Sequence, residues 1–426
     1  MDVFNQSSSD MVDIHMSILF QALQCEKNYL RIQDDTLMGD TSLVDVATKK
    51  NLQELLKFFF FFFVPDIIQS CGFCGSVRFV RWIVRSKKLG SNDVVVSPPP
   101  SYGKMVTVLS IDGGGIRGII PSASLAFLES KFQRPLNLIE AVKGPKYDGE
   151  YLHSLVRRLL GETRLDKTLA NIVIPTFDIK LLQPTIFTTY NAKAYAMKNP
   201  LLSDVCISTS AAPTYLPAHL FEVKDTKLGT SKVYNLIDGG VSANNPTLMA
   251  ISHVTKEIFK KNPDFLPIKP TGYGKFLVIS LGTGSAKEEG KYNANEAAKW
   301  GILGWLYNND SNPIINVFNQ SSSDMVDIHM SILFQALRCE KNHLRIQDDT
   351  LTGDMSSVDA ATKKNLQDLL KVGQNLLKKP VSLVNLDTGV YEAVEGEGTN
   401  EEALTRFAKL LSNERKLRQS NAPVTA

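Results

Sequence analysis

The chain has 426 residues, of which 43% are hydrophobic and 21% are charged, and its formal net charge is +3. This composition excludes disordered, collagen-like and coiled-coil proteins, and the small net charge gives no electrostatic indication of nucleic-acid binding. Five cysteines in a chain of this length exclude a disulfide framework. Cys71 and Cys74 form a single CxxC, and a zinc site needs a second pair of ligands, so we expect no metal.

The first residues have neither the basic start nor the apolar core of a signal peptide. The most apolar run, Phe58 to Val64, is far shorter than the roughly 20 residues that a membrane-spanning helix needs. We therefore expect a cytoplasmic protein without a transmembrane segment.

A long internal duplication is the strongest organisational feature. Val3–Lys57 recurs as Val317–Lys371 with 48 of 55 positions identical. Solenoid repeats recur every 20 to 50 residues, whereas these copies lie 314 residues apart. We interpret residues 1–57 as an extra fragment that duplicates 315–371. We expect this front copy to be surplus, and either loosely attached or competing for the same surface.

Residues 58–104 read as a junction or linker. Six consecutive phenylalanines, 58–63, are either translated non-coding sequence or a buried strand, and three prolines, 98–100, form a stiff connector. We place one domain at 105–416 and a tail at 417–426.

Each copy of the duplication predicts a helix, a strand and a second helix. In the second copy, the strand is expected at His343–Gln347 and the second helix at Ala360–Leu377. The first helix is expected to begin at a serine-rich cap and to bury one apolar face. That face would comprise Met325, Ile328, Ile332, Leu333, Ala336 and Leu337.

A glycine-rich turn follows the first predicted strand of the domain. Met105–Ile111 is rich in β-branched residues, Asp112–Gly118 reads DGGGIRG, and Ile119–Phe132 predicts an apolar helix. Glycines adopt positive φ and let a ligand approach the backbone. N–H groups at the start of a helix bind anions, and Arg117 adds a positive charge.

Three interpretations of this turn remain open from the residues alone. Gly113, Gly115 and Gly118 satisfy the GxGxxG pattern of dinucleotide binding, with Glu140 at the distance of a ribose-binding acid. The second interpretation is an oxyanion hole for acyl transfer. The third is a tight turn without a ligand.

A second glycine signal follows another short strand. Tyr234–Ile237 is apolar and precedes Asp238, Gly239 and Gly240. Asp238 is expected either to project into a pocket or to cap the following helix. Two further patterns accompany it. Leu202–Pro217 indicates close helix packing beside a turn, and a strand at 275–281 ends in a Gly-Thr-Gly sequence.

These segments together resemble the patatin-like family of plant lipid acyl hydrolases. The resemblance covers about residues 105–416 and rests on the ordered motifs VLSIDGGGIRGIIP, GPKYDGEYLHSL, IPTFDIKLLQPTIF, STSAAPTYLPAH, NLIDGGVSANNPT and VISLGTG. It implies a three-layer α/β/α fold and hydrolysis of fatty acyl esters of phospholipids and galactolipids by a Ser-Asp dyad, without a cofactor. The expected partner is a lipid substrate met in transient contact with a membrane surface.

The resemblance also assigns residues to roles. Gly113, Gly114, Gly115, Arg117 and Gly118 would form the oxyanion loop. Asp238, in the motif with Gly239 and Gly240, would be the base of the dyad.

One departure from the family pattern concerns the nucleophile. The family carries its serine in GxSxG between the glycine turn and GPKYDG, and this chain contains no GxSxG. Only FQRPLNLIEAV separates Lys131 from Lys143, so one core strand and the nucleophile helix are expected to be missing. The serines that lie near motifs are not on a recognisable elbow; they are Ser208, Ser210, Ser242 and Ser285.

The sequence therefore leaves three functional hypotheses. The first is a lipid acyl hydrolase by descent, impaired in this chain because Asp238 has no hydroxyl to activate. The second is a non-catalytic storage or lipid-binding remnant, or a mis-spliced gene model. The third is a nucleotide-binding α/β protein.

Overall fold

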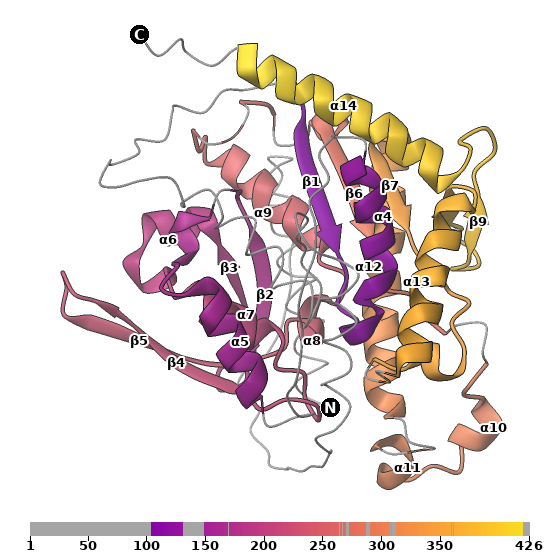
Figure 1. Cartoon of the computed structure of the whole chain (residues 1–426), viewed down its shortest axis with the longest axis horizontal. Coiled ribbons are helices and arrows are strands. Elements are labelled where there is room, and N and C mark those ends of the chain that lie inside the picture. Colours follow the sequence, from indigo (N-terminus) through magenta and orange to yellow (C-terminus); the bar gives the residue numbers. More distant parts are fainter. Residues whose placement is uncertain are drawn as a thin grey trace, which may run out of the picture.

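The computed structural model describes residues 104–130 and 149–420, except for 169, 264, 266, 270–271, 287–289, 307, 309–311, 359 and 361. The front copy of the duplication, the phenylalanine run, Cys71, Cys74 and Glu140 lie outside the described residues. In the part that is described, a parallel sheet lies to the right in Figure 1 and a larger antiparallel sheet to the left.

Three parallel strands in the order β1-β6-β7 carry the first glycine turn, namely β1 (Val106–Ile111), β6 (Phe276–Leu281) and β7 (His343–Ile346). They confirm the three strands that the sequence predicts at these places. Every residue of β6 is buried, as expected for the middle strand of a sheet that is covered on both faces. Its side chains alternate, with Leu277 and Ile279 on one face and Phe276 and Val278 on the other.

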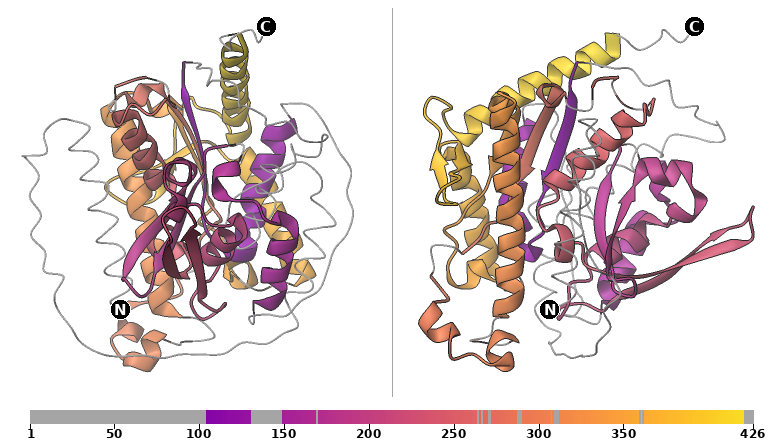
Figure 2. Two further views of the ribbon diagram at one scale, coloured as in Figure 1. Left: turned by 90° about the vertical axis from the view of Figure 1, so that its left-hand side faces the viewer. Right: turned by 180° about the vertical axis from the view of Figure 1, so that it is seen from behind.

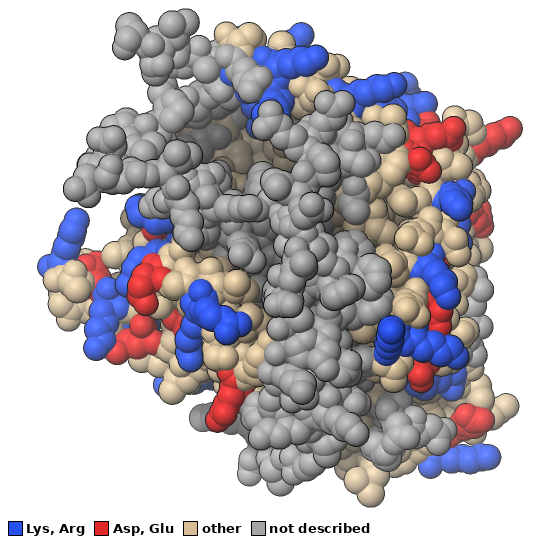
Figure 3. Space-filling view, viewed as in Figure 1, with Lys and Arg blue, Asp and Glu red and all other residues tan. Residues whose placement is uncertain are grey.

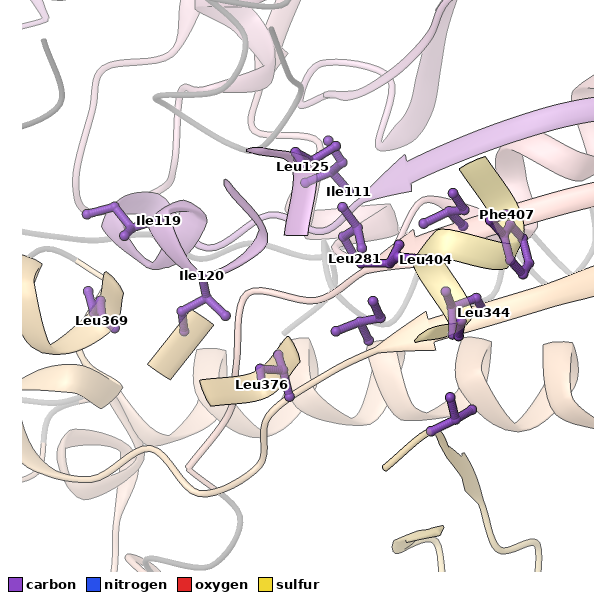
Figure 4. Close-up of a cluster of buried hydrophobic side chains, with 14 of the residues drawn as sticks. Ile111, Ile119, Ile120, Leu125, Leu281, Leu344, Leu369, Leu376, Leu404 and Phe407 are labelled. Atoms are coloured by element: carbon purple, nitrogen blue, oxygen red, sulfur yellow. The ribbon is translucent and has the colours of Figure 1, made fainter. Parts of the chain in front are cut away.

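Helices cover both faces of this sheet and complete a three-layer α/β/α arrangement, which Figure 2 shows edge-on in its left view. One layer consists of α4 (Ile119–Ser130), α13 (Lys363–Lys378) and α14 (Asn400–Ser420). The opposite layer contains α9 (Thr247–Phe259) and α12 (Pro313–Ala336). Figure 4 shows the first core, where Leu281 and Leu344 of the strands lie beside Leu404 and Phe407 of α14.

The antiparallel sheet has the order β3-β2-β5-β4 and its own apolar core. Its strands are β2 (Val173–Asp178), β3 (Gln183–Thr188), β4 (His219–Asp225) and β5 (Thr230–Ile237). The helices around it are α5 (Glu150–Leu160), α6 (Thr189–Ala194), α7 (Leu202–Thr209) and the short α8 (Gly240–Ala243). The predicted packing of Leu202–Pro217 is confirmed by the burial of most of α7.

Smaller elements complete the described chain. They are α10 (Ala294–Ala297), α11 (Ile302–Leu306), and the hairpin of β8 (Ser382–Val384) with β9 (Tyr391–Ala393). The single-turn 3₁₀ helices include η2 (Gly115–Gly118), η5 (Tyr273–Lys275), η7 (Glu340–Asn342) and η8 (Gly353–Ser356).

β1 is an edge strand of the described parallel sheet, because β6 is its one described partner. Thr107 is exposed, and Leu109 retains 46% of its accessible surface. Strands of a parallel sheet are normally covered on both faces and are apolar for that reason. The sequence of β1 therefore suits an interior position better than the edge it occupies.

The predicted buried face of α12 is wrong. Met325, Ile332 and Leu337 are each more than 40% exposed, whereas the buried residues include Ser323, Asp327, Met330, Ser331 and Phe334. The predicted serine cap is wrong as well, because Asn312 caps the helix and the serines lie within it. The apolar periodicity failed because α12 turns a partly polar face toward a buried charge.

That charge is Arg345 of β7. Its Nη1 and Nη2 donate to Oδ1 and Oδ2 of Asp112 over 3.0 and 2.6 Å, and its Nε lies 3.0 Å from Oδ1 of Asp327 in α12. Arg345 also donates to the hydroxyl of Ser280 in β6. A single guanidinium of β7 therefore joins Asp112, which precedes the glycine turn, to Ser280 of β6 and Asp327 of α12.

Two further residues complete the hydrogen bonding of Asp327. The side-chain amide of Asn245 donates to Oδ1 over 2.8 Å, and the hydroxyl of Tyr391 donates to Oδ2. Asn245 belongs to the second glycine segment, so the same buried group also holds the chain after Asp238. Buried charges of this kind are tolerated only when they are paired and hydrogen-bonded.

Each charge in this group favours the ionised form of its partner. Burial favours the neutral form of Arg345, but the carboxylates of Asp112 and Asp327 outweigh it and raise the arginine pKa well above its ordinary value. Burial raises the pKa of Asp112 to about 6, although Arg345 opposes the shift. Arg345 is therefore protonated at neutral pH.

The duplication supplies a matched test of this ion pair, since Arg31 occupies the position of Arg345 in the front copy. Arg345→Ala should lower the free energy of unfolding by about 3 to 5 kcal/mol, because it removes the positive charge that pairs with two buried carboxylates. Arg31→Ala should change it by less than about 0.5 kcal/mol. Urea denaturation of the full chain measures both values. A larger loss for Arg31→Ala would show that the front copy occupies the position next to β6.

Candidate functional site

The two glycine segments meet at the carboxyl end of β1. The N–H of Gly113 donates to the carbonyl of Asn244 over 2.8 Å, and the carbonyl of Gly113 accepts from Oγ1 of Thr283 over 2.6 Å. Asn244 lies six residues after Asp238, and Thr283 belongs to the Gly-Thr-Gly sequence after β6. The structure thus brings together three segments that are far apart in the sequence.

Glycine is required in the first turn for two different reasons. A Cβ atom on Gly114 would overlap the side chain of Thr283. Gly115 has a φ of +54°, and a Cβ atom there would overlap the carbonyl of Val358. The turn is therefore packed closely against Thr283 and Val358, which leaves no room for a side chain at either glycine.

The N–H groups of the turn differ in whether they are already used. Those of Gly113 and Ile116 donate to backbone carbonyls. Those of Gly114 and Gly115 donate to no residue in the described part of the chain. Gly118 is buried in η2, at the start of α4. Among the five residues predicted for the oxyanion loop, we therefore take the N–H groups of Gly114 and Gly115 as the candidate donors.

Arg117 points to another loop. Its Nη1 donates to the carbonyl of Gly284 over 2.8 Å. Burial lowers its pKa to about 10, against the opposing influence of Tyr215 and Asp112, so the side chain stays charged at neutral pH. In this structure Arg117 ties the glycine turn to the connection after β6.

Asp238 lies directly after β5, where its backbone N–H donates to the carbonyl of Ala211 over 3.0 Å. One carboxylate oxygen accepts from the N–H of Gly240 over 2.6 Å, so Asp238 caps the turn into α8. Its other carboxylate oxygen has no partner among the described residues. Gly239 is fixed by space, because a Cβ atom there would overlap the carbonyl of Pro175.

Burial raises the pKa of Asp238 to about 7, although the hydrogen bond from Gly240 favours the charged form. A carboxyl group with such a pKa exchanges its proton near neutral pH. Asp238 closes the turn before α8 with one oxygen and does not cap the helix itself, whose N-cap is Gly239; its projection into a pocket stays a prediction.

Asn244 links the two glycine segments. Its Oδ1 lies 2.7 Å from the position that a Cβ atom would take on Gly113, and 3.4 Å from the corresponding position on Gly240. Its Nδ2 donates to Ser323 of α12 over 3.0 Å. The side chain thus occupies the space between the turn and the segment that carries Asp238.

The four serines considered as substitutes for the nucleophile do not pair with Asp238 in the described structure. Ser208 donates to the carbonyl of Asp204 and Ser285 to the carboxylate of Asp349, each over 2.7 Å. Ser242 faces the carbonyl of Gly239 at 3.4 Å. Ser210 is buried at the end of α7.

Sequence reasoning missed Arg345, Asn244 and Thr283, which fix the geometry of the site. One signal was present, because Asp112 follows an apolar strand and a buried carboxylate requires a partner. Arg345 is the charged residue inside the apolar strand β7, which makes it the natural candidate. The contacts of Asn244 and Thr283 depend on packing that no local pattern encodes.

Within the described residues, no three acidic, cysteine or histidine side chains lie close enough to hold a metal ion together. Among the same residues, no helix combines the length and the apolar character needed to cross a bilayer.

Comparison with known proteins gives a consistent assignment. Residues 122–251 match the patatin-like phospholipase family. Patatin-like protein 2 of Arabidopsis thaliana is 49% identical over 390 residues, covering 76% of this chain and 95% of that protein. Patatin-like protein 2 of Oryza sativa subsp. indica is 49% identical over 392 residues, covering 76% and 96%.

A third relative is named as probably lacking activity. Probable inactive patatin-3-Kuras 1 of Solanum tuberosum is 38% identical over 379 residues, covering 76% of this chain and 96% of that protein. Together with the α/β/α layers and the paired glycine segments, these similarities show that the chain belongs to the patatin-like phospholipase family.

Proposed function

We propose that the site between the glycine turn and Asp238 binds the carboxylic ester of a membrane lipid, and that this chain does not turn the ester over. One observation carries the proposal. Among the described residues, the N–H groups of Gly114 and Gly115 and one oxygen of Asp238 have no hydrogen-bond partner and belong to adjoining segments, yet no described serine hydroxyl pairs with Asp238. Binding groups and a base are present, and the nucleophile is missing.

Each part has a defined chemical role. Two backbone N–H groups suit the oxygen of an ester carbonyl, which gains negative charge during acyl transfer. Asp238, with a pKa of about 7, can accept a proton from an attacking alcohol near neutral pH. Without that alcohol no acyl-enzyme forms, and the covalent route is closed.

The length of the alignment supports the absence of the core strand and nucleophile helix from this chain. The match to the Arabidopsis relative spans 390 positions but covers 76% of 426 residues, about 324, so roughly 66 positions have no counterpart in this chain. The partly exposed edge of β1 suits the loss of a neighbouring strand. Both observations favour a deletion, and the absence of GxSxG before GPKYDG assigns it to the segment between α4 and α5.

Two alternatives remain distinct from this proposal. A mis-spliced gene model would leave the same chain, and transcript sequencing across residues 132–143 would show whether a GxSxG block is restored. Nucleotide binding is disfavoured because the second glycine segment, which that function does not require, lies directly against the first. We also propose, on the sequence argument alone, a cytoplasmic location and an extra N-terminal fragment at 1–57.

Hydrolysis of a p-nitrophenyl acyl ester tests the proposal. The unmodified chain and Asp238→Ala should give equal rates, because removing a base has no effect when there is no hydroxyl to activate. Replacing residues 131–148 by the corresponding segment of the Arabidopsis relative should raise the rate by about 10³-fold or more, in an Asp238-dependent manner. Turnover by the unmodified chain that Asp238→Ala abolishes would contradict the proposal and identify a substitute serine.

The charge state of Asp238 predicts a pH dependence. Its pKa of about 7 exceeds the ordinary value of 3.8, so the folded chain holds a proton that the unfolded chain releases. The free energy of unfolding therefore falls as the pH rises through this window and levels off above it. Asp238→Asn keeps the acceptor for Gly240 and removes the titration.

The stability advantage of Asp238→Asn over the unmodified chain should grow by roughly 1 to 3 kcal/mol when the pH is raised from about 4 to about 8. The gain is smaller than full burial would give, because Asp238 retains some solvent exposure. Denaturant titrations at both pH values measure it. An equal difference at the two pH values would show that Asp238 is ionised throughout.

A further inference from the structure

An exposed apolar segment extends from the connection after β6. We call Lys299–Leu306, with the sequence KWGILGWL, the apolar tip. Ile302 is 79% exposed and Leu303 is 81% exposed, which makes them the most exposed large hydrophobic side chains in the described part of the molecule. Exposing two adjacent aliphatic side chains is unfavourable in water, so the tip requires an explanation.

The apolar tip is held in this position by an aromatic base. The ring of Trp300 lies edge-on to Trp305 at 5.3 Å and to Tyr292 at 5.7 Å between ring centres. The hydroxyl of Tyr292 accepts from Asn316 of α12 over 3.0 Å. The aromatic rings thus attach the tip to a long helix, and Ile302 and Leu303 extend from this support into solvent.

The tip lies at the same end of the parallel sheet as the candidate site. Its connection leaves the carboxyl end of β6, and the first residues of that connection, Thr283 and Gly284, bond to the glycine turn. In Figure 1, α10 and α11 lie at the bottom, toward which β1 and β7 run. Ligands of α/β proteins bind at the carboxyl ends of the strands.

We propose that the apolar tip docks this protein on the surface of a lipid bilayer, which rests on the proposed function of the site. Aliphatic side chains enter the acyl boundary, and tryptophan rings prefer the level of the head groups. The indole N–H groups of Trp300 and Trp305 have no partner among the described residues. Lys299 is the one charge of the tip, and it suits anionic head groups.

Charge and size favour a bilayer over a protein partner. Residues 297–308 contain no carboxylate, whereas acidic and basic side chains are interspersed over the described face in Figure 3. A stable interface between copies of a protein buries about 800 Å² on each partner, which eight residues around a five-residue helix do not supply. Insertion into a bilayer needs no complementary surface.

Vesicle flotation tests the proposal with the full chain and phosphatidylcholine vesicles that contain a minor fraction of phosphatidylglycerol. Leu303→Asp should lower the partition coefficient about tenfold, because it places a carboxylate in the acyl boundary. The matched control is Leu228→Asp on the turn between β4 and β5, where Leu228 is 72% exposed, and it should bind as the unmodified chain does. Both sites are exposed, so neither change should alter the fold.

Tryptophan emission gives a second measurement. In a Trp82→Phe background, the two remaining tryptophans are both in the apolar tip. Vesicles should shift their emission to shorter wavelength, and Leu303→Asp should remove the shift.

Equal vesicle binding by Leu303→Asp and Leu228→Asp would overturn the proposal. So would loss of self-association in Leu303→Asp with unchanged vesicle binding, which would make the tip an interface between copies of the chain. Binding is measured without catalysis, so an inactive chain can still dock. Failure to dock would leave the evidence for the ester site unaffected.

Discussion

The buried ion group of Asp112, Arg345 and Asp327 is the constraint on which the site depends. Asp112 fixes the start of the glycine turn, and Asp327 holds Asn245 in the segment after Asp238. Because Arg345 is the shared partner, the two halves of the site are aligned through one side chain. An unpaired charge at this depth is strongly unfavourable, so the group forms as a unit or not at all.

Local patterns predicted the strands and glycine turns well, because β-branched runs and consecutive glycines have few structural alternatives. They failed for α12, where hydrophobic periodicity placed Met325 and Ile332 inside although both are exposed. The helix turns Asp327 inward instead, since that residue completes the bonding of Arg345. A buried ion pair between distant segments leaves no periodic signal, and for the same reason the roles of Asn244 and Thr283 could not be predicted.

The family assignment and the details of this chain lead to different conclusions about activity. Family membership follows from the fold and from similarity over most of each relative. The partly exposed edge of β1 and the length of the alignment both support the proposed loss of a segment from this chain. The proposed ester-binding groups come from other segments, namely the glycine turn and the residues after β5. On the proposed function, this separation lets the architecture of the family persist in a chain that lacks the nucleophile.

Labelling with a fluorophosphonate, which reacts with an activated serine, tests this account most directly. The unmodified chain should remain unlabelled, and a chain carrying the relative's segment in place of residues 131–148 should be labelled at the introduced serine. Asp238→Ala in that restored chain should suppress the reaction. Stoichiometric labelling of the unmodified chain would contradict the account, because it would show that a nucleophile is already present.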